Sequence, residues 1–241
     1  MAARRAPARQ GGAALLILVA IAGLGMATLL ISALGKNNAQ AAREQRTVLL
    51  LAQASDALVG FAAAHGRLPR PAQSALDGSE RPSACDSEQA CTGLLPWVTL
   101  GVAGVDSWGK LLRYSVTPAL TQAPVQSISA VATKTVSGRA PGGKFEFLGG
   151  QDSCELAAQC LPFVLYSSGK NNFGTGVGGA ALANASRSNL DEVANNSASL
   201  HFIARVASDN PLQPGGEFDD LLNWITLPSL YNRMKAARNL P

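Results

Sequence analysis

An unbroken apolar stretch near the N-terminus constrains this chain more than any other feature. Residues 13–34 carry no charge, and about 20 helical residues are enough to cross the hydrocarbon core of a bilayer. The residues before this stretch include Arg4, Arg5 and Arg9 and no acidic residue. The positive-inside rule therefore predicts a cytoplasmic N-terminus, with everything after the stretch outside the cytoplasm.

Three kinds of segment fit such a stretch to different degrees. A cleaved secretory signal has an apolar core of about 7–15 residues before a small-residue cleavage site. Ala39-Gln40-Ala41 offers that site, but the core before it is too long. An uncleaved signal anchor fits both the length and the charges. The third kind is cut after a glycine on the cytoplasmic side, so that the apolar helix is kept.

The junction RQGG-AALLIL, in which Gly12 precedes Ala13, resembles that of the type IV pilin-like family. The resemblance implies cleavage by a prepilin peptidase between Gly12 and Ala13, with Gly11 as the alternative cleavage point. Most pilins carry Glu as the fifth mature residue, where this chain has Ile17. In the family that carboxylate pairs with the amine of the preceding subunit, and tip subunits such as the K-type pseudopilin lack it. The chain would then be a tip or accessory subunit, or have no filament role.

Composition narrows the classes of partner. The 241 residues leave room for one domain beyond the apolar stretch, and only 15% of them are charged. The formal charge of +4 includes the three arginines of residues 1–12, so the remainder is close to neutral. Since no cluster of Lys and Arg with interleaved aromatics is present, we expect no nucleic-acid partner.

Four cysteines fall in two similar frames, Cys85 with Cys91 and Cys154 with Cys160. An even number in a domain outside the cytoplasm indicates disulfides. Sequential pairing would close two small loops, each stabilising by about 2 kcal/mol, but the two other connectivities remain open. Zinc is the rival interpretation, and no histidine lies at ligand spacing from either frame.

The hydrophobic pattern predicts an α+β protein. Helical periodicity continues beyond residues 13–34 through an amphipathic half at 35–65, and Gly66 should end the helix. This long helix is expected to pack on a small antiparallel β-sheet head, residues 66–241, that ends in helices. Strands are predicted within residues 94–102 and 111–120 and at 125–135, 144–148, 161–166 and 200–206, and C-terminal helices near 219–223 and 228–239.

A motif in the head also resembles pseudopilins and minor pilins, which commonly carry D-P-W-G-x-x-x-x-Y at a strand entry. Asp106, Trp108, Gly109 and Tyr114 match it, and Ser107 replaces the proline. We expect a tight turn in which Asp106 accepts hydrogen bonds from the backbone and Gly109 adopts a permissive dihedral angle. A D-x-W-G sequence by itself indicates no more than a hairpin turn.

In major pseudopilins a later loop binds calcium through acidic side chains. The matching residues 167–174 offer Asn171 and Asn172 but no acidic residue. Because calcium prefers several oxygen ligands that include carboxylates, we expect neither a metal nor another cofactor.

Asp219 and Asp220 invite interpretation as a catalytic pair, but neighbouring residues on a helix point about 100° apart. We therefore predict that one of them caps a helix. The sequence contains no nucleophile elbow, zincin helix or phosphate loop. His65 is expected to close a helix and His201 to be a satisfied strand residue, so the chain is not expected to be an enzyme.

Together these features imply a structural minor pilin or pseudopilin of a type IV pilus or a type II secretion pseudopilus. It would span the bacterial inner membrane once, with its head in the periplasm or in a periplasmic or extracellular filament. Its partners would be prepilin peptidase and other subunits packed against residues 13–34, where Gly23 and Gly25 permit close helix approach. The main alternative is an unprocessed, membrane-anchored periplasmic binding or adaptor domain, and a periplasmic hydrolase is a third.

Overall fold

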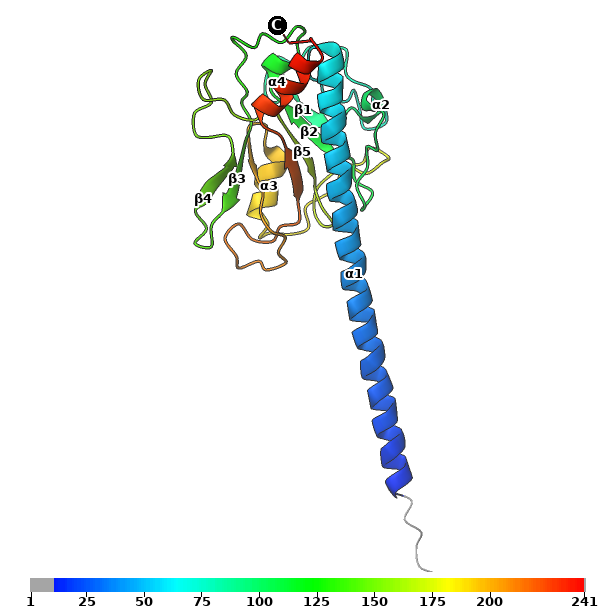
Figure 1. Cartoon of the computed structure of the whole chain (residues 1–241). Coiled ribbons are helices and arrows are strands. Elements are labelled where there is room, and N and C mark those ends of the chain that lie inside the picture. The colour runs from blue at the N-terminus through cyan, green and yellow to red at the C-terminus, as the bar shows by residue number, and fades with distance from the viewer. Residues whose placement is uncertain (1–10, 241) are drawn as a thin grey trace, which may run out of the picture. The chain divides into compact units, whose positions relative to one another are not determined.

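The computed structural model describes residues 11–240, and of residues 11–37 it describes the backbone alone. Helix α1 extends from Gly11 to His65, 55 residues in all, so the predicted long N-terminal helix is present. The chain divides into two compact units, Met1–Arg43 and Glu44–Pro241. The second unit is the α+β head, to which α1 contributes the residues from Glu44 onward (Figure 1).

The C-terminal end of α1 is formed as the sequence predicts. Gly66 has a φ of +68°, a left-handed conformation that glycine adopts without steric cost, and its N–H donates to the Ala62 carbonyl at 2.9 Å. The Nδ1 atom of His65 lies 2.9 Å from the Phe61 carbonyl, and the two rings stack. His65 therefore closes the helix.

The head side of α1 is part of the hydrophobic core. Leu51, Ala54, Leu58 and Ala62 are at most 1% exposed, and their spacing of three or four residues places them on one helix face. They belong to the main core cluster, which also contains Tyr114, Phe163 and Met234.

By length and composition, Asn38–His65 could cross a membrane. This is the one such helix among the residues whose side chains the structure describes, and core helices of soluble domains meet the same test. The buried residues above belong to the core of the head, and the side chains of the apolar residues 13–34 lie outside the described part.

The main sheet is antiparallel and has the strand order β1-β2-β5-β7. Strands β2 and β5 form its centre, with Tyr114 opposite Leu165. All five residues of β5 are buried, since this strand lies between two core clusters. The strands are β1 (Thr92–Leu94), β2 (Arg113–Val116), β5 (Phe163–Ser167) and β7 (Leu221–Trp224).

A second, three-stranded sheet has the order β4-β3-β6. Strand β3 pairs antiparallel with β4, with an irregularity between Val136 and Ser137, and parallel with β6. This sheet is therefore mixed. Its strands are β3 (Thr135–Arg139), β4 (Phe145–Gly149) and β6 (His201–Ile203).

Four short helical segments complete the described elements. The 3-10 helix η1 follows β2, and α3 packs near β6. Helix α4 buries Leu227, Leu230 and Met234 in the main core. The segments are α2 (Trp97–Leu100), η1 (Pro118–Leu120), α3 (Leu190–Ser197) and α4 (Leu227–Ala236).

Three predicted elements were wrong. Residues 94–102 contain α2 after the end of β1, because Pro96 interrupts the extended run and Gly101, at φ +65°, closes a helical turn. Residues 125–135 are mostly irregular, and β3 begins at their last residue. Residues 219–223 do not form a helix, because Leu221–Trp224 pairs as a strand with β5.

Candidate functional site

The turn at Asp106 is built as the sequence predicts. Its Oδ1 accepts the backbone N–H groups of Trp108 at 2.8 Å and Lys110 at 2.9 Å. Gly109 has a φ of +82° and donates to the Asp106 carbonyl. The N–H of Ser107 reaches Thr47 Oγ1 of α1 at 3.2 Å. The motif therefore forms a tight turn against the helix.

Tyr114, the last residue of the motif, is fully buried in β2 and donates its hydroxyl to the Pro69 carbonyl at 3.0 Å. Trp108 is partly buried, and its indole N–H has no hydrogen-bond partner among the described residues. Tyr114 is part of the main core cluster.

Lys110 directs its ammonium group into the loop after β5. It is only 4% exposed, and its Nζ donates to the carbonyls of Ser168 at 3.0 Å, Asn172 at 2.9 Å and Asn171. This loop is the stretch that the sequence compared with a calcium-binding loop. In this structure Lys110, from the Asp106 turn, donates hydrogen bonds to the backbone carbonyls of that loop.

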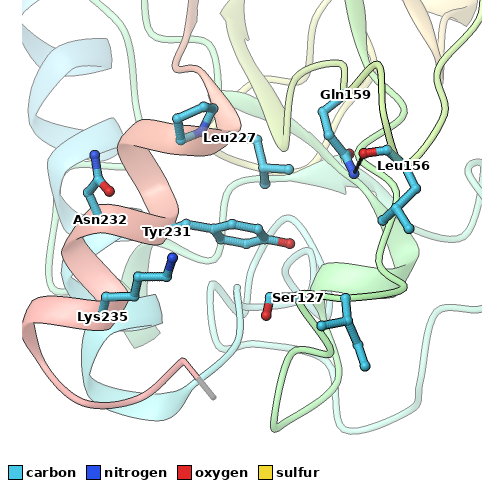
Figure 2. A pocket seen from close by; sticks show the side chains of 9 residues that line it. Ser127, Leu156, Gln159, Leu227, Tyr231, Asn232 and Lys235 are labelled. Atoms are coloured by element: carbon cyan, nitrogen blue, oxygen red, sulfur yellow. Dashed lines mark hydrogen bonds between the residues drawn. The ribbon is translucent and has the colours of Figure 1, made fainter.

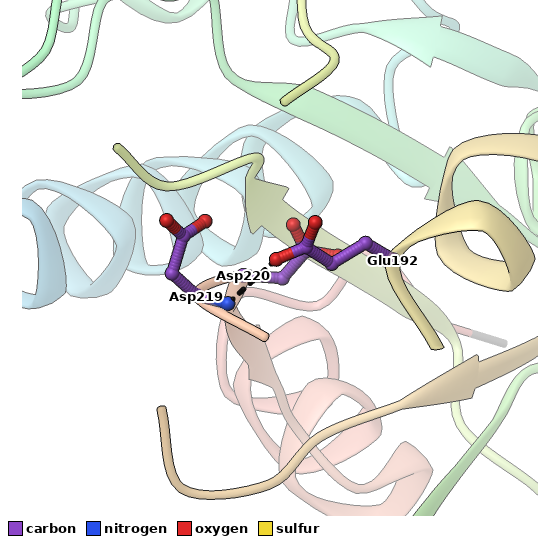
Figure 3. Close-up of side chains that lie close together, drawn as sticks. All are labelled: Glu192, Asp219 and Asp220. Atoms are coloured by element: carbon purple, nitrogen blue, oxygen red, sulfur yellow. Dashed lines mark hydrogen bonds between the residues drawn. The ribbon is translucent and has the colours of Figure 1, made fainter. Parts of the chain in front are cut away.

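Three carboxylates lie beside the loop, from Glu192, Asp219 and Asp220 (Figure 3). One oxygen of each lies within 4.8 Å of the others. Glu192 comes from α3, whereas the two aspartates immediately precede β7. Glu192 Oε1 accepts the Asp219 N–H at 2.8 Å, and Asp219 Oδ2 accepts the Asn171 N–H at 2.9 Å.

The prediction that Asp219 or Asp220 caps a helix is wrong, because a strand follows them. Asp220 is 6% exposed, and its Oδ2 accepts the Asn195 amide at 2.9 Å. Asp219 Oδ1 is buried without a hydrogen-bond partner among the described residues. The two aspartates thus fix the entry to β7 against α3 and the Asn171 loop.

Burial governs the charges of this cluster. It raises the pKa of Asp219 to about 6, although the Asn171 N–H acts in the opposite direction. It raises the pKa of Asp220 well above its ordinary value, against the Asn195 amide, and the Glu192 carboxylate adds to both effects. Burial also lowers the pKa of Lys110, against the surrounding carboxylates. Burial therefore disfavours the charged forms of Asp219, Asp220 and Lys110 alike.

The donor set consists of hard oxygen atoms, the kind that Ca²⁺ and Mg²⁺ prefer. The Lys110 ammonium already balances part of the negative charge and uses the loop carbonyls. Sequence reasoning missed this cluster, because Lys110, Glu192 and Asp219 are far apart in the chain. No local signal joins them.

The four cysteines form two disulfides, Cys85–Cys91 and Cys154–Cys160. This is the sequential pairing among the three that the sequence left open. The first disulfide lies in the main core, where both cysteines are at most 1% exposed.

A groove of about 500 Å³ lies between α4 and the loops around residues 128 and 156. Tyr231 reaches into it from α4 (Figure 2), and its buried hydroxyl has no hydrogen-bond partner among the described residues. Ile128 and Leu156 add exposed apolar surface, and Lys235 adds a positive charge at its border.

The predicted cleavage site, Gly12 and Ala13, lies outside the residues whose side chains the structure describes. Residues 1–10 lie outside the described residues, and Gly11, Gly12 and Ala13 lie in the first turn of α1, where the backbone alone is described.

Of the two histidines, His201 places Nδ1 2.8 Å from Thr135 Oγ1.

Comparisons with protein-family models, with curated proteins and with solved structures gave no match.

Proposed function

We propose that this chain is a structural, pilin-like subunit that is cut by a prepilin peptidase and retains its apolar helix. The observation that carries the proposal is the composition of α1. One helix of 55 residues contains the uncharged residues 13–34 in its first part and the core residues Leu51 and Leu58 of the head in its second.

This composition supports a role in which the helix and the head act as one subunit. The apolar residues 13–34 and the core residues of the head belong to one helix. This helix links the head to the membrane or to the subunits that surround the apolar residues. Apolar helices with small residues such as Gly23 and Gly25 associate by close packing in membranes. Other subunits of the same kind are the partners that this geometry favours.

The head supports a structural role through its rigidity. Two disulfides and the hydrogen-bonded turn at Asp106 stabilise loops that would otherwise be mobile. The lack of the fifth-residue Glu, where Ile17 stands, favours an accessory or tip position in a pilus or a secretion pseudopilus.

The test is the N-terminus of the chain produced with and without a prepilin peptidase. Intact-mass measurement should show loss of residues 1–12 only with the peptidase. Gly12→Leu should block the cut, whereas Gly11→Ala should leave it unchanged. If only the Gly11 variant blocks processing, the cleavage point is after Gly11 and not after Gly12. A wild-type chain that is not processed would refute the proposal.

A membrane-anchored binding or adaptor domain is the second candidate, and the Tyr231 groove favours it. In that case the chain keeps Met1 or Ala2 at its terminus in the presence of the peptidase. Replacement of Tyr231 by Phe would then weaken the binding function of the domain in the cell. The Gly12→Leu variant would keep that function.

A further inference from the structure

A cavity of about 310 Å³ lies beside β1, an outer strand of the main sheet. Its walls come from β1, β2, the last turn of α3 and the loop of residues 173–182. Backbone hydrogen bonds hold this loop in place, because the Leu182 N–H donates to the Gly174 carbonyl at 2.9 Å and the Gly176 N–H donates to the Ala180 carbonyl at 2.9 Å. The walls are thus fixed by the fold, as they are in most binding sites for small molecules.

Arg113, from β2, is the one charged residue among those that line the cavity. Its Nη1 donates to the Asn196 carbonyl at 3.1 Å and to Asn196 Oδ1 at 2.9 Å. Its guanidinium also lies over the ring of Tyr166, 5.2 Å from the ring centroid. These contacts hold the guanidinium in one orientation, and no acidic residue lines the cavity with it.

The charge of Arg113 lacks the partner that four other partly buried arginines of the head have. Each of those four pairs with a carboxylate; they are Arg67, Arg70, Arg139 and Arg205. Within residues 38–240 Arg113 forms no ion pair, and its hydrogen bonds there come from Nη1 alone. Nε and Nη2 are therefore left for a ligand, and a planar guanidinium matches a carboxylate in a bidentate pair.

The rest of the cavity offers apolar surface, from Leu94, Phe173 and Leu182. Phe173 has a φ of +51°, a left-handed conformation that is uncommon for a bulky residue. The residue before it is held firmly, since the Asn172 carbonyl accepts the Lys110 ammonium at 2.9 Å. Backbone strain that the surroundings maintain in this way is concentrated at binding and catalytic sites.

We propose that this cavity binds a small organic carboxylate that carries an apolar group. The carboxylate pairs with Nε and Nη2 of Arg113, and the apolar group lies against Phe173 and Leu182. The volume favours a small free acid, because ligand pockets span about 300–1,000 Å³ and this one is at the lower end. The site lies in the head, so binding depends neither on peptidase processing nor on residues 13–34.

Titration calorimetry of the full-length, detergent-solubilised protein with phenylacetate, benzoate and butyrate tests the proposal. At least one of them should bind with a Kd of about 1 mM or below. Arg113→Met should weaken that binding at least about tenfold, because it removes hydrogen bonds to a charged group. Arg81→Met is the matched control, since Arg81 is also partly buried but does not line the cavity. It should leave the Kd unchanged.

A second variant tests the cavity without changing Arg113, in case Arg113→Met folds poorly. Leu182→Trp enlarges a side chain that is 43% exposed at the wall, and it should weaken binding at least about tenfold by filling the cavity. Val177→Trp, in the same loop and 61% exposed but outside the lining, is its control and should bind as wild type does.

The neutral analogue phenylacetamide should bind at least about tenfold more weakly than phenylacetate, because it cannot form the charged pair with Arg113. Equal binding of the two would overturn the proposal. So would the absence of Arg113-dependent or Leu182-dependent binding for all three carboxylates. Tighter binding of inorganic phosphate than of any of these carboxylates would also overturn it, since the site would then belong to another class of anion.

Discussion

The Ser167 hydroxyl donates to Asp106 Oδ2 at 2.6 Å and thereby joins the end of β5 to the turn before β2. The other Asp106 oxygen accepts two backbone N–H groups of the same turn. A single buried carboxylate therefore fixes the turn, the central strand and the start of the Asn171 loop.

Asp106→Ala should destabilise the head. The substitution leaves the N–H groups of Trp108 and Lys110 and the Ser167 hydroxyl without their acceptor, and each buried group left unpaired costs about 1–3 kcal/mol. We expect a total loss of about 3 kcal/mol in urea unfolding of the detergent-solubilised protein. Asp152→Ala, in an exposed loop, should change stability by less than about 0.5 kcal/mol. Equal losses for both variants would contradict the role of Asp106.

Lys110→Met should be similarly destabilising. It retains the length of the side chain but removes the ammonium group that donates to the carbonyls of Ser168, Asn171 and Asn172. Each buried group left unpaired costs about 1–3 kcal/mol. Combining it with Asp219→Asn should cost less than the sum of the two single changes, because the second removes a carboxylate that lost its counter-charge. Lys170→Met, exposed in the same loop, is the control. Strict additivity would argue against electrostatic coupling.

The pH dependence of stability should reveal Asp219. Its pKa rises from an ordinary value of 3.8 to about 6 in the folded protein, so between those values the folded state binds more protons than the unfolded state. Its contribution to stability is therefore largest below about pH 4 and is lost as the pH rises through 6. Between pH 4 and pH 7, wild type should therefore lose stability relative to the Asp219→Asn variant. A difference that is independent of pH would contradict the raised pKa.

The two disulfides should contribute unequally. Both enclose loops of the same sequence separation, 6 residues, so the chain-entropy contribution is about 2 kcal/mol for each. Cys85 and Cys91 are also part of the main core, whereas Cys154 is partly exposed. Replacing the first pair by alanines should thus cost more in thermal unfolding than replacing the second. The reverse order would indicate that the first loop is fixed by its other contacts.

Local features of the fold could be predicted from the sequence. The long helix and its end at Gly66 follow from periodicity and a glycine stop, and the Asp106 turn follows from four neighbouring residues. Strands with clear flanking turns, such as β4 and β5, were also found near their true positions.

Features that depend on distant contacts could not be predicted. Leu221–Trp224 is a strand because β5 offers it a partner, and the parallel pairing of β6 with β3 makes the second sheet mixed. Likewise, the Lys110 cluster depends on folding that brings residues from three segments together. The spacing of residues along the sequence does not indicate such long-range contacts.

The proposed function requires that the chain is matured at its N-terminus and keeps α1. Mass spectrometry of the protein extracted from membranes that contain a prepilin peptidase measures this directly. We predict a chain that begins at Ala13 and carries two disulfides. A terminus at Met1 or Ala2, or a free head that begins near Ala41, would contradict it.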